Sequence, residues 1–154
     1  MSSDLRHDLR QTKPFPSPET EAALSVLRTA ALLGSAVAET LKPHGLTPTQ
    51  YNVLRILRGA GDGGLCRHEV GDRLVTPVPD VTRLLDRLEA SARIRRHRDP
   101  EDRRQVRACI TPQGLRRLAK LDGVLDALHR QQLGHLEEQQ LRTLSDVLAA
   151  ARAR

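Results

Sequence analysis

Aromatic residues are almost absent from this chain of 154 residues. Phe15 and Tyr51 are the only two, and there is no tryptophan. Proteins that bind RNA or single-stranded DNA by stacking need several aromatic side chains on one surface. The shortage therefore argues against a stacking-based binder of single strands.

Cysteines and long apolar runs are scarce as well. The two cysteines, Cys66 and Cys109, cannot supply a disulfide framework. No uninterrupted apolar run of about 18 residues is present, so we expect no membrane span. Residues 1–13, MSSDLRHDLRQTK, lack the apolar segment of a secretory signal. Together these absences favour a soluble, cytoplasmic protein with an aliphatic core.

Basic residues are abundant but unevenly placed. The chain has 25 Lys and Arg against 19 Asp and Glu, a formal net charge of +6. Residues 93–107 contain seven Arg and three acidic residues, a local net charge of +4, whereas residues 66–90 contain four Arg and five acidic residues. A solvated, Arg-rich turn is the commoner explanation of a charge run. A finger that reaches into a phosphate-lined groove is the alternative.

Hydrophobic periodicity predicts helices over most of the chain. Ser17-Pro18-Glu19 and the capping box Thr47-Pro48-Thr49-Gln50 are typical helix starts, because a hydroxyl N-cap precedes a proline in the first turn. We expect one helix from Pro18 to residues 43–45, a second from Pro48 to the glycine-rich loop 59–64, a short third over Arg67–Leu74, a fourth that opens at Thr76-Pro77, a long one from Pro112 to Gly134, and a last one over residues 137–152.

The period changes after the fourth helix. Residues 94–98 and 105–110 are typical of two strands, the second alternating with Val106, Ala108 and Ile110 on one face, and residues 99–104 form a hairpin loop between them. The arginine excess therefore lies on a hairpin. Two short helices followed by a basic hairpin are typical of a winged helix-turn-helix, whose second helix enters the major groove. We expect a mainly α fold with a small β-hairpin wing that binds nucleic acid.

Four motifs in register resemble the MarR family of bacterial transcription regulators. They are TPTQYNVL at residues 47–54, VTRLLDRLE at 81–89, DPEDRR at 99–104 and ITPQG at 110–114. The second resembles the family's recognition helix and the third its wing, and the resemblance covers about residues 20–152. One departure is Ala92-Arg93-Ile94, where the family usually has Gly-Leu-Val. Alanine in place of glycine at a left-handed helix end costs about 1 kcal/mol.

This resemblance implies a homodimeric, sequence-specific regulator of double-stranded DNA, a repressor released by a small-molecule or stress signal. Residues 17–45 and 112–154 would be dimerisation helices, residues 46–111 the DNA-binding lobe, and residues 1–16 a flexible arm. Dimer symmetry implies a pseudo-palindromic site with half-sites about one helical turn apart. The alternative is a winged-helix dimer that acts as a protein-interaction or non-specific DNA-binding module.

The resemblance also implies which residues bind DNA. They are Thr76, Val78, Asp80, Thr82 and Arg83 of the recognition helix, and Arg96, Arg98, Arg103 and Arg104 of the wing. Asp80 can accept a hydrogen bond only from a cytosine amino group and repels phosphate, so it would specify a sequence rather than strengthen binding. Each arginine can instead make a surface salt bridge worth about 0–1 kcal/mol, and an internal carboxylate is an alternative partner for Arg104.

Relatives in the family often respond to a small aromatic or anionic effector. Tyr51 is the one aromatic residue that could line such a pocket, with His44 and Arg28 as polar partners. A Tyr51 packed in the core with its hydroxyl satisfied is the alternative that we favour. A Cys66–Cys109 redox switch is a second option, although cytosolic cysteines are most often plain reduced core residues.

We expect neither a metal site nor a cofactor nor an enzyme activity. The six histidines show no spacing of four residues on a helix and no clustering with cysteine. The chain contains no glycine-rich phosphate loop, nucleophile elbow or paired acid/base helix motif.

Overall fold

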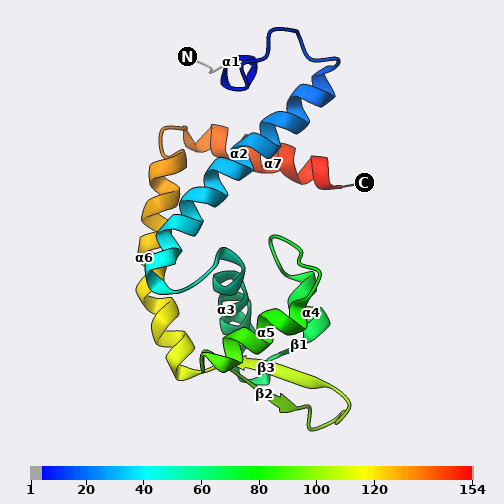
Figure 1. Cartoon of the computed structure of the whole chain (residues 1–154), viewed down its shortest axis with the longest axis vertical. Helices are drawn as coiled ribbons and strands as arrows, with labels where there is room; N and C mark the ends of the chain where they lie inside the picture. Colours follow the sequence, from blue (N-terminus) through cyan, green and yellow to red (C-terminus); the bar gives the residue numbers. More distant parts are fainter. Residues whose placement is uncertain (1–4, 154) are drawn as a thin grey trace.

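The computed structural model describes residues 5–153 (Figure 1). Its elements are α1 (Leu5–Asp8), α2 (Pro18–Leu41), the 3-10 helix η1 (Lys42–His44), α3 (Pro48–Ala60), the 3-10 helix η2 (Gly61–Gly63), β1 (Leu65–Cys66), α4 (Arg67–Asp72), α5 (Val81–Ala90), β2 (Ile94–Arg98), β3 (Val106–Ile110), α6 (Pro112–Leu133) and α7 (Glu138–Arg152). The predicted fold class, mainly α with a small antiparallel wing, is confirmed. The N-terminal arm predicted over residues 1–16 includes residues 1–4, which lie outside the described residues, and α1 forms within its remainder.

Three helices begin where the hydroxyl–proline pairs predict. The Ser17 Oγ accepts a hydrogen bond from the Thr20 amide at 3.2 Å. The Thr47 Oγ1 accepts from the Gln50 amide at 3.1 Å, and the Gln50 Oε1 accepts from the Thr47 amide at 3.1 Å. The Thr111 Oγ1 accepts from the Gly114 amide at 3.0 Å. These bonds satisfy amide groups that have no partner inside the helix.

The helix α5 starts at Val81, so the predicted start at Thr76-Pro77 is wrong. Its N-cap is Asp80, whose Oδ1 accepts a hydrogen bond from the Arg83 amide at 2.9 Å. Each of the two prolines, Pro77 and Pro79, disfavours a helical backbone at the residue before it. The segment from residue 75 to residue 80 therefore stays irregular, and Thr76 and Val78 lie in the loop before α5 rather than in its first turn.

The wing is a three-stranded antiparallel sheet in the order β1-β3-β2. Leu65 of β1 pairs with Ala108 of β3, and Ile94 of β2 pairs with Ile110. Gly64 permits this arrangement, since its φ is +64° and a Cβ there would lie 2.4 Å from the Ala108 carbonyl oxygen. The short β1 thereby ties the start of α4 to the base of the wing.

Ala92 occupies the left-handed position expected at the end of α5. Its φ is 57°, and its carbonyl oxygen accepts a hydrogen bond from the Thr111 Oγ1 at 2.7 Å. Because that hydroxyl also caps α6, one threonine joins the end of the recognition helix to the start of the long helix.

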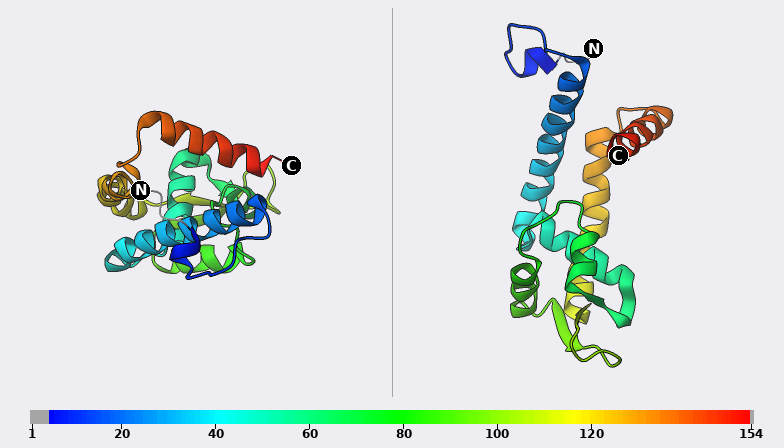
Figure 2. Two further views of the ribbon diagram at one scale, coloured as in Figure 1. Left: turned by 90° about the horizontal axis from the view of Figure 1, so that it is seen from above. Right: turned by 90° about the vertical axis from the view of Figure 1, so that its right-hand side faces the viewer.

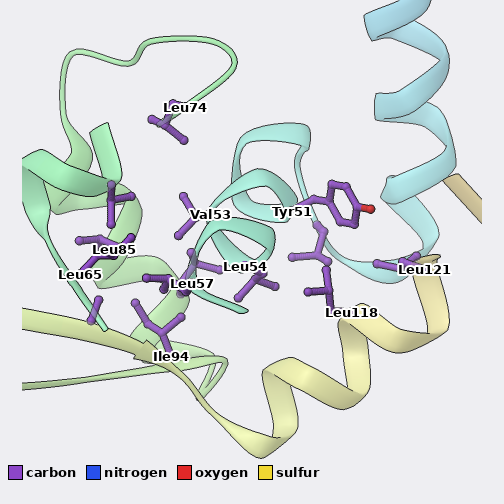
Figure 3. Packing of buried hydrophobic residues seen from close by; sticks show 14 of the residues in the cluster. Tyr51, Val53, Leu54, Leu57, Leu65, Leu74, Leu85, Ile94, Leu118 and Leu121 are labelled. Atoms are coloured by element: carbon purple, nitrogen blue, oxygen red, sulfur yellow. The ribbon is translucent and has the colours of Figure 1, made fainter. Parts of the chain in front are cut away.

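The core lies where α3, α5, the wing and α6 meet. Leu54, Leu57, Leu88 and Leu118 are completely buried there, and Ile94 is nearly so. Figure 3 shows Leu118 and Leu121 of α6 beside Tyr51 and Leu54 of α3. The helix α6 therefore carries the lobe at one end and continues away from it at the other (Figure 1).

Two helices extend to the end of the molecule opposite the wing. In Figure 1 α2 and α7 cross, but the views in Figure 2 separate them. Exposed apolar side chains occur on both helices, and Leu27, Leu32 and Val147 are 65%, 58% and 60% exposed. None of the most apolar stretch of Pro18–His44 is buried within the chain.

Although polar residues interrupt its apolar run, one helix is long and apolar enough on average to meet the length and composition test for a membrane span. The run Pro18–His44 passes that test by length and apolar character. Residues 22–38 contain a single charged residue, Arg28, and small residues rather than charges interrupt the leucines. The same features are found in a helix that is covered by another protein chain.

Candidate nucleic-acid interface

The helix α5 presents one polar face beside the wing. Leu85 and Leu88 point into the core, whereas Thr82, Arg83 and Arg87 are exposed. This division follows the helical period, which places residues three and four apart on one face. The exposed face is thus free of any core role.

Asp80 already has a structural task at the start of α5. One of its carboxylate oxygens caps the helix, as described above. The contact with a cytosine amino group stays a prediction, and the capping role is one that the sequence reasoning missed. An aspartate directly before an apolar-periodic segment is the signal that could have revealed it.

Arg96 is occupied by two carboxylates of α5. Its Nε and NH2 donate to the Glu89 Oε2 at 2.8 and 2.5 Å, and NH2 lies 2.6 Å from the Asp86 Oδ1. The hydrogen bonds from Arg96 lower the pKa of Glu89 below its ordinary value. This arginine therefore fixes the strand β2 against the recognition helix.

The wing loop is organised around Asp99 and Arg107. The carboxylate of the buried Asp99 pairs with the Arg107 Nε and accepts from the amides of Glu101 and Asp102 at 2.8 and 3.1 Å. The Arg107 hydrogen bond, with these amides, lowers the pKa of Asp99 to about 2. The Arg107 NH1 donates to the Gly64 carbonyl oxygen at 3.1 Å. Sequence reasoning counted Arg107 only as part of the charge run.

The other predicted wing arginines lie at or near the loop. The Arg98 NH1 donates to the Arg103 carbonyl oxygen at 2.8 Å, and the Arg103 side chain is exposed. The backbone amide of Arg104 donates to the Asp102 Oδ1 at 3.1 Å. Between residues 5 and 153, no carboxylate lies within 4.0 Å of the Arg104 guanidinium. The internal carboxylates bind Arg96 and Arg107 instead.

Tyr51 is buried and lines a cavity of about 280 Å³. Val37 of α2, Leu125 and His129 of α6 and Val75 also line it. The Tyr51 hydroxyl accepts a hydrogen bond from the Arg55 NH1 at 3.2 Å. His44 and Arg28 do not line this cavity, so the structure does not bring the three predicted effector residues together.

Both cysteines are free and buried, and each sulfur has its own partners. The Cys66 Sγ donates to the Glu69 Oε2 at 2.9 Å, and the Cys109 Sγ donates to the Asp62 carbonyl oxygen at 3.3 Å. Burial, together with Glu69, raises the pKa of the Cys66 thiol. A raised pKa keeps the thiol protonated and less reactive, which does not favour a redox switch.

The described part of the chain contains no group of three or more His, Cys, Asp or Glu side chains that could hold a metal ion.

A pair of helices with an exposed polar recognition face, joined to a basic wing, defines a winged helix-turn-helix protein. The sequence profile of the MarR family matches residues 44–105. The uncharacterized HTH-type transcriptional regulator YkoM of Bacillus subtilis is 33% identical over 111 residues, which cover 70% of this chain and 71% of that protein.

Several solved structures share the fold of this chain. A MarR transcription factor from Planctomyces limnophilus matches with 35% identity and a TM-score of 0.68, over 89% of this chain and 99% of that one. MepR of S. aureus, solved with DNA, shares the fold at a TM-score of 0.76 and 18% identity, over 84% of this chain and 94% of that one. CouR of Rhodococcus jostii, solved with p-coumaroyl-CoA, shares the fold at a TM-score of 0.76 and 23% identity, over 91% of this chain and 98% of that one.

This chain belongs to the MarR family, and it is a non-enzymatic helix-turn-helix transcriptional regulator that binds DNA.

Proposed function

We propose that this chain is a cytoplasmic homodimer that represses transcription from a pseudo-palindromic DNA site and releases it when a small aromatic or anionic effector binds. The main support is that the exposed face of α5 lies beside an arginine-rich wing, whereas α2 and α7, which expose apolar side chains, lie at the opposite end of the molecule (Figure 1).

Dimerisation is supported by the apolar side chains that α2 and α7 leave uncovered. Val26, Leu27 and Leu32 of α2 and Leu144 and Val147 of α7 are 41–65% exposed. Soluble monomers rarely expose contiguous apolar patches of this kind, and a second copy of the chain would cover both helices. A lipid surface is the competing occupant for α2, and the experiment below separates the two.

Contacts to bases or adjacent phosphates would come from Thr82 and Arg83, and further phosphate contacts from Arg98, Arg103 and Arg104. These side chains are exposed on α5 and the wing. Thr76, Val78 and Asp80 precede the regular part of the helix and would approach the edge of the groove. Arg96 would act through α5, because two carboxylates hold its guanidinium.

Effector release is supported by the cavity at Tyr51, because it lies where α2 and α6 meet the DNA-binding lobe. CouR binds p-coumaroyl-CoA on the same fold. The volume of about 280 Å³ is close to the lower limit of small-molecule pockets, which suits a single aromatic ring. A ligand there would change the angle between the lobe and the dimerisation helices.

Binding of the full-length protein to its own upstream DNA tests the proposal. We expect fluorescence anisotropy to show tight binding that unrelated duplex displaces only in large excess. Arg83→Ala should reduce this preference. Arg142→Ala, whose side chain pairs with Glu138 on α7, should not. Equal competition by unrelated duplex would instead indicate the non-specific module.

Light scattering and vesicle flotation test the dimer. We expect twice the chain mass in solution and no flotation with anionic vesicles. A monomer that floats with the vesicles would contradict the assignment of α2 to a dimer interface. Candidate aromatic acids should weaken DNA binding in the wild type and not in Tyr51→Ala.

A further inference from the structure

We propose that the cavity between α4, α5 and the base of the wing is a phosphate-binding site that takes one DNA backbone phosphate in each half-site. The cavity, called the phosphate cavity below, measures about 380 Å³ and is lined by Arg67, His68, Thr82, Arg104 and Gln105, among others. Arg67, His68 and Gln105 are outside the set that the sequence predicted. This inference rests on the proposed DNA interface and assigns one of its contacts.

The arginines around this cavity fall into two groups. Arg96 faces Asp86 and Glu89, and Arg107 faces Asp99 and Glu69, so carboxylates neutralise both. Within residues 5–153, neither Arg67 nor Arg104 has a carboxylate within 4.0 Å. Their positive charges therefore remain available to an external anion.

Arg67 already donates a hydrogen bond to the Thr82 hydroxyl, whose own proton remains available to an anion. Its NH1 lies 3.4 Å from the Thr82 Oγ1, which joins the start of α4 to the exposed face of α5. Arg104 approaches from the wing and lines the same cavity. Two guanidinium groups and a hydroxyl from three elements are the donor types that proteins use for phosphate oxygens.

The floor of the cavity offers an anion no free carboxylate. Leu85 and Ala108 form apolar parts of it and are buried. The nearby Glu69 already accepts from the Cys66 amide and thiol, both at 2.9 Å, and faces Arg107. A phosphate would thus meet donors without a repelling acidic group in the lining.

The position of the cavity indicates DNA as the source of the phosphate. A recognition helix enters the major groove, and the wing of this fold lies beside it. The sugar–phosphate backbone separates neighbouring grooves, so we expect it to pass between α5 and the wing. The cavity lies between these two parts of the chain, and its volume of about 380 Å³ leaves room for a phosphate group.

Salt dependence of DNA binding tests the assignment, with Arg67→Ala as the variant and Arg142→Ala as its control. Apart from its hydrogen bond to Thr82 the Arg67 side chain is exposed, so we expect an unchanged circular dichroism spectrum. Arg67→Ala should weaken binding by a similar factor for upstream and unrelated duplex. It should also reduce the slope of log K against log salt by about 0.9 per half-site. An unchanged slope, or a loss confined to the upstream sequence, would overturn the proposal.

Neutral methylphosphonate linkages locate the contact. We expect one position in each half-site at which the neutral linkage weakens the wild type and has no further effect on Arg67→Ala. If every position affects both proteins equally, the cavity takes no backbone phosphate.

Inorganic phosphate distinguishes a DNA-dependent site from a general anion site. At matched ionic strength, phosphate should compete with DNA more strongly than chloride for the wild type and equally for Arg67→Ala. Equal competition by both salts for the wild type would argue against an anion site in the cavity. If the wild type binds all duplexes alike, the repressor proposal fails, while the slope comparison still decides the role of Arg67.

Discussion

Three of the four glycines at residues 59–64 allow the geometry of the wing base to be tested quantitatively. Gly59 lies inside α3, and a Cβ there would have no neighbour within 4 Å. Gly61 has a φ of +70°, and a Cβ there would also lie in open space. Gly64 has a φ of +64°, but a Cβ there would clash with the neighbouring strand. Alanine at these three positions adds the same methyl group to three different environments.

The expected free energies follow from those environments. Gly59→Ala should stabilise the protein by about 0.5–1 kcal/mol, because alanine is the better helix former. Gly61→Ala should cost about 1–2 kcal/mol for the backbone alone, because its φ of +70° and ψ of −158° form a combination that essentially only glycine adopts. Gly64→Ala adds a methyl group 2.4 Å from the Ala108 carbonyl oxygen and 2.5 Å from the Cys109 Sγ. Such overpacking costs about 1–3 kcal/mol more, for a total of about 2–5 kcal/mol.

Urea unfolding at a fixed protein concentration would measure the three differences, and anisotropy would measure DNA affinity. We expect Gly64→Ala also to weaken DNA binding, because β1 must move away from β3 and takes the start of α4 with it. Equal costs for Gly61→Ala and Gly64→Ala would refute the close packing of β1 against the wing.

Three further predictions concern ion pairs and the uncovered helices. The folded-state pKa of Asp99 is about 2, below its ordinary value of 3.8. The ionised carboxylate should therefore contribute its full stabilisation above about pH 4 and lose it as the pH falls through about 2. In Asp99→Asn the free energy of unfolding, measured by urea at each pH, should change less over this range. Arg96→Ala should lower the free energy of unfolding by about 1–2 kcal/mol and weaken binding to every duplex, because two carboxylates of α5 lose their shared partner. Arg95→Ala should leave the free energy of unfolding unchanged. Leu27→Glu should convert the dimer to a monomer, as measured by light scattering. Val75→Glu should not, because Val75 lies in a loop and its side chain is 86% exposed. If the Leu27→Glu variant remains a dimer, the interface lies elsewhere.

Local chemistry made most helix boundaries predictable. Ser17, Thr47 and Thr111 each precede a proline, and all three cap a helix through their own hydroxyl. The start of α5 was not predictable in the same way, because Thr76-Pro77 has the same local form. Pro79 two residues later prevents a helix from forming there, and Asp80 supplies the cap instead.

The pairing of the arginines could not be predicted, since their carboxylate partners are distant or ambiguous in sequence. Glu69 and Arg107 are 38 positions apart and meet only because β1 pairs with β3. Asp86 and Glu89 are one helical turn apart on α5, but nothing in the sequence shows that both face Arg96. The charge count therefore located the wing correctly without indicating which of its charges are free.

This distinction changes how the arginine excess acts on DNA. The local charge of +4 over residues 93–107 includes Arg96 and Arg107, which hold the wing to α5 and to its own loop. It omits Arg67, which lies earlier in the chain and has no carboxylate partner in the described residues. An arginine that is already paired with a carboxylate gains less from DNA, because it exchanges one ionic partner for another. We therefore expect the free arginines, rather than the arginine-rich segment, to set the electrostatic part of the affinity.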